Sequence, residues 1–232
     1  MTGVVAAGVP GVRPRRPSPF TRICDSPQIA TRTEQPSAQY ADHHARLLEG
    51  LADSIRARGL SGTTVADVVR AARVSRRTFY EHFDDLVDAY LELMTWLGDD
   101  MLKDVQAAIE SSGTTEERID RAVARYLERL DEEPELARSY WLEYHLTGER
   151  GRGSAVSNSE RTAELFGQLA QELRAGDAAV RAPLPFEAMV MLTGSIREIV
   201  LHQFERERPA SEVFAVVAWM VRLVATADPP GS

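Results

Sequence analysis

The sequence predicts an all-α protein of about nine helices, three short ones at the front and a larger helical body behind them. From Tyr40 to about Thr226, apolar residues recur at the spacing of helices. No stretch shows sustained alternation of apolar and polar residues, and no Asn-Gly or Asp-Gly turn separates strand-like runs. The composition, 44% hydrophobic and 27% charged, is typical of a soluble globular protein.

The 232 residues are enough for one large domain, or for a small domain and a larger one. The longest apolar runs, such as 213–221, are much shorter than the ~20 residues that cross a bilayer, so we expect no membrane protein. The single cysteine, Cys24, excludes an internal disulfide and any site that needs several cysteine ligands. Because VVAAGV precedes RPRR, the reverse of the order in a secretory signal, we expect a cytoplasmic protein.

Charge is distributed unevenly along this chain of net charge −8. Residues 1–40 carry a net +3 and residues 41–83 a net +2, whereas residues 84–232 carry −13. The overall acidity argues against a nucleic-acid partner, but the average hides this asymmetry. A basic front and an acidic body indicate two separate tasks in one chain.

The first 38 residues hold six of the twelve prolines and no apolar periodicity. We expect residues 1–38 to form a disordered, basic and Pro-rich arm. A start codon assigned too far upstream would give the same pattern.

Three helices are expected at about 40–58, 63–74 and 75–83, within a first domain of residues 39–85. The apolar stripe of the first consists of Leu47, Leu48, Leu51 and Ile55. The second begins with a capping box in which Thr64 and Asp67 bind each other's backbone. Ser75 is the expected N-cap of the third.

Residues 86–232 form the predicted body. Its helices are expected near 86–110, 115–131, 135–146, 158–175, 186–206 and 210–226. Gly113, Pro134 and Pro209 lie at breaks between them. The Gly- and Arg-rich stretch at 148–153 could suggest a phosphate-binding loop, but no strand precedes it, so we expect a flexible connection.

A tight turn joins the second and third helices, as in a helix-turn-helix. Phe79 and Phe83 lie four residues apart, which buries one face of the third helix. The residues left outward or flanking are Arg76, Arg77, Thr78, Tyr80 and His82. Because arginine forks match guanine and hydroxyl or imidazole groups reach phosphates, this set fits a reader of duplex DNA. A solvated surface with a Tyr/His pair in a crevice would give the same pattern.

The order of residues here resembles the DNA-binding segment of the TetR (tetracycline-repressor) family of transcriptional regulators. The shared features are Thr64, Ala71-Ala72, Val74-Ser75, Phe79-Tyr80 and His82-Phe83. The resemblance covers residues 40–95, and beyond them only helix number and length agree. It implies a ligand-responsive regulator, most often a repressor, that binds a palindromic operator in double-stranded DNA as a homodimer.

Two positions depart from the family pattern. Arg73 stands at the turn position that is usually glycine, and a positive φ there would strain a residue with a side chain. Leu86 replaces the lysine that commonly opens the fourth helix and grips a phosphate. The basic arm at 13–32 could compensate by lying in the minor groove, as homeodomain arms do.

Carried over residue by residue, the resemblance assigns Arg76 and Arg77 to base reading and Thr78 to a base or the backbone. Tyr80, His82 and Thr64 would contact phosphates or position the helix. The expected DNA-binding set is Thr64, Ser75, Arg76, Arg77, Thr78, Tyr80 and His82.

The last two helices are apolar on more than one side. In the final helix the apolar residues are Val213, Phe214, Val216, Val217, Trp219, Met220, Leu223 and Val224. Because a helix at the surface of a monomer shows a single apolar stripe, we expect both helices to pair with their copies across a two-fold axis. A hairpin enclosed in a monomeric core is the alternative.

Aromatic residues and methionines concentrate between the two ends of the chain. They are Met94, Trp96, Met101, Tyr126, Tyr140, Trp141, Tyr144, His145 and Phe166. The resemblance implies that these helices enclose a ligand cavity, whose apolar walls would suit an apolar or amphipathic effector of little charge. Aromatic residues at helical spacing also fit a plain core. Glu143 is either a pocket group or exposed, and Arg121 and Arg125 are expected in surface ion pairs.

An enzyme is the main rival class. His43 and His44 are adjacent rather than four apart, an HExxH motif is absent, and no glycine-rich nucleotide loop follows a strand. We therefore expect no catalytic residues, no cofactor and no metal. A helical adaptor that binds protein and never DNA is the remaining alternative.

Overall fold

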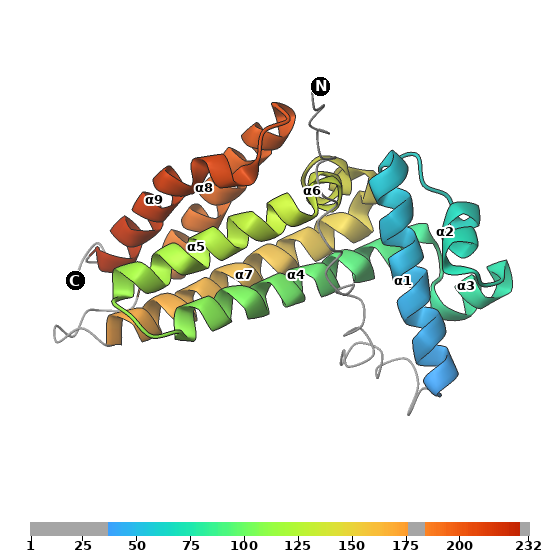
Figure 1. Ribbon diagram of the computed structural model, residues 1–232, viewed down its shortest axis with the longest axis horizontal. Helices are drawn as coiled ribbons and strands as arrows, with labels where there is room; N and C mark the ends of the chain where they lie inside the picture. Colours follow the sequence, from blue (N-terminus) through green and yellow to red (C-terminus); the bar gives the residue numbers. More distant parts are fainter. Residues whose placement is uncertain (1–36, 176–183, 228–232) are drawn as a thin grey trace, which may run out of the picture.

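The computed structural model describes residues 37–175 and 184–227, in which helices are joined by short turns and loops (Figure 1). No strand occurs among these residues, as the sequence predicted. Most of the predicted arm, residues 1–36, lies outside the described part of the chain. The disorder of the arm and its contact with DNA stay predictions.

Three helices form a small domain at one end of the molecule: α1 (Ala38–Arg58), α2 (Val65–Ala72) and α3 (Arg76–His82) (Figure 1). Ser37 caps α1 by accepting from the Tyr40 amide. Helices α1 and α2 approach closely at Gly50, where an added Cβ would lie 2.8 Å from the Ala72 nitrogen. A larger residue at this position would push the two helices apart.

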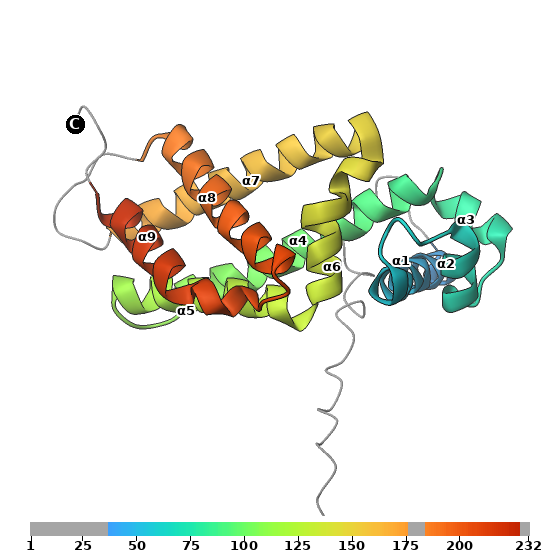
Figure 2. The same cartoon turned by 90° about the horizontal axis from the view of Figure 1, so that it is seen from above.

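The long helix α4 (Leu86–Glu110) runs from this domain into the body, and Asp85 caps its start. The body adds α5 (Thr115–Glu132), α7 (Gly148–Ala175), α8 (Phe186–Glu205), the 3-10 turn η5 (Ala210–Val213) and α9 (Phe214–Thr226). Helix α5 packs on α4 and on α9, and α7 packs on α8. Viewed from above, α8 and α9 lie together over the α4, α5 and α7 layer (Figure 2).

A crossing segment, residues 133–147, separates the body from α1 (Figure 2). The sequence predicted one helix at 135–146. The structure divides it into α6 (Pro134–Arg138), a π-helical turn η3 (Ser139–Glu143) and a 3-10 turn η4 (Tyr144–Thr147).

The prediction of a flexible connection at 148–153 was wrong, because α7 begins at Gly148. One tertiary contact and one local contact accompany the early start. The Arg150 guanidinium pairs with Asp85 and Asp88 at the start of α4. Gly151 faces Thr147 so closely that an added Cβ would lie 1.4 Å from its hydroxyl oxygen, so this turn requires glycine.

The buried apolar residues form two cores. One joins α1, α2, α3 and the first half of α4 around Leu51, Phe79 and Tyr90. The other joins α5, α8, α9 and the second half of α4 around Leu127, Val200 and Phe204. In the described part of the chain, no helix is long and apolar enough to cross a membrane.

Candidate DNA-binding surface and effector cavity

Helices α2 and α3, which flank the turn, each begin with a local cap. The Thr64 side chain accepts from the Asp67 amide, and the Asp67 carboxylate accepts from the Thr64 amide, as the predicted capping box requires. The side-chain hydrogen bond from Thr64 keeps the pKa of Asp67 below its usual value, against a smaller effect of burial. The Ser75 hydroxyl accepts from the Thr78 amide and so caps α3.

Arg73 in this turn adopts a left-handed conformation, with φ 55° and ψ 42°. The positive φ that would strain a residue with a side chain is therefore present at Arg73. Arg46 of α1 offsets part of this cost, since its guanidinium donates to the Ala72 carbonyl at 2.5 Å and to the Arg73 carbonyl at 3.1 Å. The sequence pattern did not single out Arg46, because its partners come from another helix.

Helix α3 presents four long polar side chains to solvent: Arg76, Arg77, Tyr80 and Glu81. The Arg76 guanidinium lies 5.8 Å from the centre of the Tyr80 ring, and Arg77 pairs with Glu81 at 3.0 Å on the helix surface. Because exposed ion pairs of this kind contribute little, both guanidinium groups can exchange these contacts for a partner.

The expectation that His82 lies outward or flanking was wrong, because its exposed fraction is 2%. Its Nδ1 lies 3.3 Å from His44 Nδ1, and the Nε2 of His44 lies 2.5 Å from Glu92 of α4. The Tyr40 ring covers His82 at 3.9 Å between ring centres. His82 therefore joins α1, α3 and α4 in the isolated chain, a role set by two partners far away in sequence.

The body encloses a cavity of about 710 Å³ between α4, α5, the crossing segment, α7, α8 and α9. This volume is suited to a small organic ligand. Among the predicted residues, those that line it are Met94, Met101, Tyr126, Tyr140, Trp141, Tyr144, His145 and Phe166. Burial raises the pKa of Tyr126, so its hydroxyl stays protonated and can donate to a bound molecule.

Trp96 is the predicted residue that does not line the cavity. It is buried in the core shared by the small domain and α4. Two helical positions correspond to a rotation of about 200°, so Trp96 faces away from Met94, which does line the cavity. The cluster of aromatic residues in sequence could not distinguish these two faces.

The cavity is also lined by four arginines that the aromatic pattern did not include: Arg129, Arg152, Arg161 and Arg197. Arg129 is bound to Asp100 at 2.9 Å, and Arg161 to Asp99 at 2.6 Å. Within the described residues, neither Arg152 nor Arg197 lies within ion-pairing distance of a carboxylate. Arg197 instead covers the Trp141 ring at 5.6 Å. The Trp141 Nε1 is buried and has no hydrogen-bond partner among the residues described.

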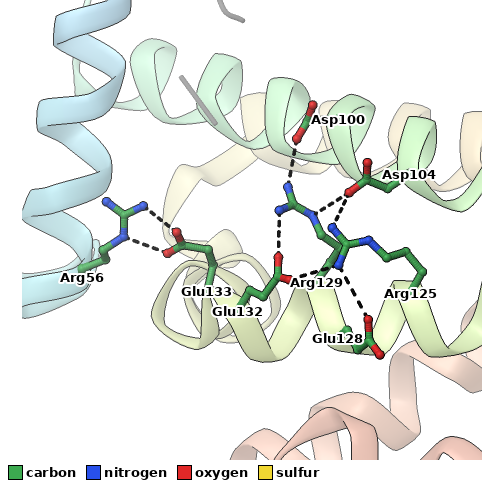
Figure 3. A network of polar contacts seen from close by, with 8 residues as sticks. All are labelled: Arg56, Asp100, Asp104, Arg125, Glu128, Arg129, Glu132 and Glu133. Carbon is green, nitrogen blue, oxygen red and sulfur yellow. Dashed lines mark hydrogen bonds and ion pairs between the residues drawn. The ribbon is translucent and has the colours of Figure 1, made fainter. Parts of the chain in front are cut away.

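Arg129 also belongs to a network that joins α4 and α5 beside the cavity (Figure 3). It pairs with Asp104 and Glu132, and Arg125 pairs with Asp104, Glu128 and Glu132. The expected ion pair of Arg125 with Glu128 is present at 3.7 Å. Arg121 differs, as it binds Ser111 Oγ and the Ser112 carbonyl. In the described part of the chain, no group of three or more cysteines, histidines or acidic residues is arranged to hold a metal ion.

Residues 47–85, from α1 to the residue before α4, match the family model of bacterial regulatory proteins of the tetR family. This segment of the chain resembles the DNA-binding part of TetR-family regulators. The helix-turn-helix prediction is therefore confirmed.

Solved structures of bacterial transcriptional regulators share the fold over about four fifths of this chain. The fatty acid degradation regulator FadR from Bacillus halodurans superposes with a TM-score of 0.67 at 16% identity, over 80% of this chain and 95% of that one. A regulator from Rhodococcus sp. gives 0.66 at 17%, over 80% and 100%. FadR from Bacillus subtilis, solved in complex with stearoyl-CoA, gives 0.62 at 16%, over 78% and 97%. The search of curated proteins found no match.

Helices α8 and α9 leave a broad apolar face uncovered. Its exposed members are Phe186, Val190, Met191, Val216, Trp219 and Leu223. The exposed fractions of Met191 and Trp219 are 73% and 54%. The alternative of an enclosed hairpin is wrong for these side chains, since a buried hairpin would cover them.

Proposed function

We propose that this protein is a TetR-family regulator, a cytoplasmic repressor that binds a palindromic operator as a homodimer and leaves it when an effector fills the cavity. The observation that carries the DNA part is the exposed Arg76, Arg77 and Tyr80 on a helix capped at its start. Arg76 and Arg77 read bases in the major groove, while Thr64, Ser75, Thr78 and Tyr80 bind phosphates or position α3. His82 acts from beneath the helix by packing against His44.

The homodimer forms through α8 and α9. Their exposed Met191, Trp219 and Leu223 form part of an apolar patch of the kind that marks protein interfaces. Two copies related by a two-fold axis would cover it and present two α3 helices to half-sites ~34–36 Å apart.

Selection of bound duplexes from a random pool tests the DNA proposal. We expect a palindromic sequence, bound with an affinity that falls steeply as salt rises, because phosphate contacts release counterions. A folded dimer that enriches no duplex would contradict the proposal and support the protein-binding adaptor.

Trp219→Asp tests the interface. We expect it to convert the dimer into a folded monomer with much weaker operator binding, measured by sedimentation velocity and fluorescence anisotropy. The matched control is Leu146→Asp, which places the same charge at an exposed apolar residue outside the patch. A dimer that survives Trp219→Asp would contradict this interface.

The effector is an amphipathic molecule with an acidic group, and so carries more charge than the ligand expected from the aromatic residues. The cavity lining is mainly apolar, and it carries four arginines against Asp99 and Glu133. A cationic lining inside an acidic body favours a ligand with negative charge. FadR from Bacillus subtilis, bound to stearoyl-CoA, shares the fold and provides a precedent for such chemistry.

Palmitate, palmitoyl-CoA and 1-hexadecanol distinguish the forms of this ligand. We expect palmitate or its thioester to release the operator, and the alcohol to fail. Arg152→Ala and Arg197→Ala should weaken the release, whereas Arg208→Ala, outside the cavity, should not. Equal release by the alcohol would contradict an acidic effector.

A further inference from the structure

The crossing segment contacts both the cavity and the DNA-binding domain, and Glu133 does both. Leu136, Tyr140 and Trp141 line the cavity. Glu133 and Glu143 bind α1 and the loop that follows it. Any movement of this short segment therefore changes contacts both in the cavity and with the DNA-binding domain.

Glu143 holds the loop between α1 and α2. One carboxylate oxygen accepts from the Leu60 amide at 2.8 Å, and the other accepts from the Ser61 amide at 3.3 Å and the Ser61 hydroxyl at 3.0 Å. Gly59 begins this loop with φ 72°, and an added Cβ there would lie 3.0 Å from the same carboxylate. Three donors on one carboxylate fix where α2 starts relative to the body.

A second carboxylate, that of Glu133, also joins the crossing segment to α1. Glu133 forms a two-point bond with the Arg56 guanidinium in the last turn of α1, at 2.8 and 2.9 Å (Figure 3). This pair anchors the end of α1, whereas Glu143 binds the loop that leads to α2.

Three aromatic residues close to Glu143 in the chain, Tyr140, Trp141 and Tyr144, form part of the cavity wall. Tyr144 follows Glu143 directly, and its ring lies 5.0 Å from that of Tyr140 and 5.9 Å from that of Tyr90 on α4. Glu143 itself ends the π-helical turn, a geometry often found at functional sites. Because Tyr140, Trp141 and Tyr144 share one short turn with Glu143, a ligand that displaces these rings also moves its carboxylate.

We propose that Glu143 is the positioning residue through which occupation of the cavity changes the placement of the α1–α2 loop and so the affinity for DNA. The inference rests on the proposed role of the cavity as the effector site. When the cavity is filled, Glu143 withdraws from Leu60 and Ser61, and α2 and α3 lose their fixed position.

Gly98→Phe tests this link without a known ligand. Gly98 lies on α4 in the cavity wall, and an added Cβ would meet nothing within 4 Å, so the ring can enter the cavity. We expect hydrogen exchange at the Leu60 amide to accelerate by about tenfold, as its bond to a charged acceptor is lost. If this variant does not fold, saturation with palmitate supplies the occupant. An unchanged rate at Leu60 with the cavity filled would overturn the proposal.

Operator affinity in combined variants gives the second measurement. Gly98→Phe should weaken binding by about tenfold in the natural background and by less than about twofold with Glu143→Gln. Glu135→Gln is the matched control, since this exposed carboxylate on α6 does not bind the loop, and it should leave the response intact. Equal weakening in all backgrounds would overturn the role of Glu143. The exchange measurement needs no DNA, so failure of the proposed regulator function would be recognised separately.

Discussion

The two cores of this protein are packed differently. In the DNA-binding domain, Leu51 and Phe79 are completely buried against neighbours from α1 to α4. The body surrounds about 710 Å³ of space, so residues such as Phe166 contact protein on one side only. A close-packed core transmits displacement as a unit, whereas a core with a cavity can adapt to an occupant. The comparison indicates a rigid reading domain attached to a body that can change shape.

The largest expected effect is a difference in unfolding free energy between a truncation in one core and the same truncation in the other. We expect Phe79→Ala to lower the free energy of unfolding by about 3–5 kcal/mol, because it leaves a void in a filled core. Phe166→Ala should cost about 1 kcal/mol, since it enlarges an existing space. Urea unfolding followed by circular dichroism measures both, and similar losses would show that the cores do not differ.

A smaller effect concerns the surface of the rigid domain. Arg77→Ala should remove about 1–3 kcal/mol of discrimination between the best operator and a variant at the contacted base. Tyr80→Phe should weaken binding to all duplexes alike, because a phosphate contact carries no sequence information. Anisotropy titrations on matched and altered operators would reveal both patterns. A uniform loss in Arg77→Ala would assign that side chain to the backbone instead.

One capping device occurs in both regions and allows a matched test. Thr64 with Asp67 caps α2, and Thr114 with Glu117 caps α5 in the same way. We expect Thr64→Ala and Thr114→Ala each to destabilise by about 1 kcal/mol in thermal unfolding. Only Thr64→Ala should also weaken operator binding. If Thr114→Ala weakens it equally, then stability alone explains the effect.

The smallest effect is the pH dependence at the junction of the two regions. Burial alone would raise the pKa of Glu143, but hydrogen bonds from Leu60 and Ser61 outweigh it and hold the pKa below its usual value. A lowered pKa in the folded state gives stability above the ordinary glutamate range, which is lost as pH falls through the folded value. Glu143→Gln should therefore flatten the decline in unfolding free energy below about pH 4 by less than about 1 kcal/mol. Glu135→Gln should retain the natural slope.

The sequence predicted the helix-turn-helix closely because its signals are local. The predicted helix at 75–83 matches α3 with its Ser75 cap, and 86–110 matches α4 residue for residue. Eight of the nine expected cavity residues line the cavity, because aromatic side chains recur at the spacing of one helix face. Trp96 did not fit, since composition alone carries no information about the opposite face of α4.

The residues that sequence reasoning missed have partners distant along the chain. Arg46 reaches the turn after α2, Arg150 reaches the start of α4, and Glu143 reaches the loop after α1. A charged residue in a helical pattern gives no indication of which remote group it meets. The expected flexible loop at 148–153 was wrong for the same reason, since its helix is stabilised by Arg150.

By itself, the sequence determined the all-helical class, the caps and breaks, and the family of the DNA-binding segment. These properties depend on hydrogen bonds and side-chain spacing within a few residues. Tertiary structure alone decided that His82 is buried, that arginines enter the cavity wall, and that one carboxylate joins this wall to the loop after α1. Such features arise only when helices separated by many residues pack together, because burial and charge pairing are set by neighbours in space.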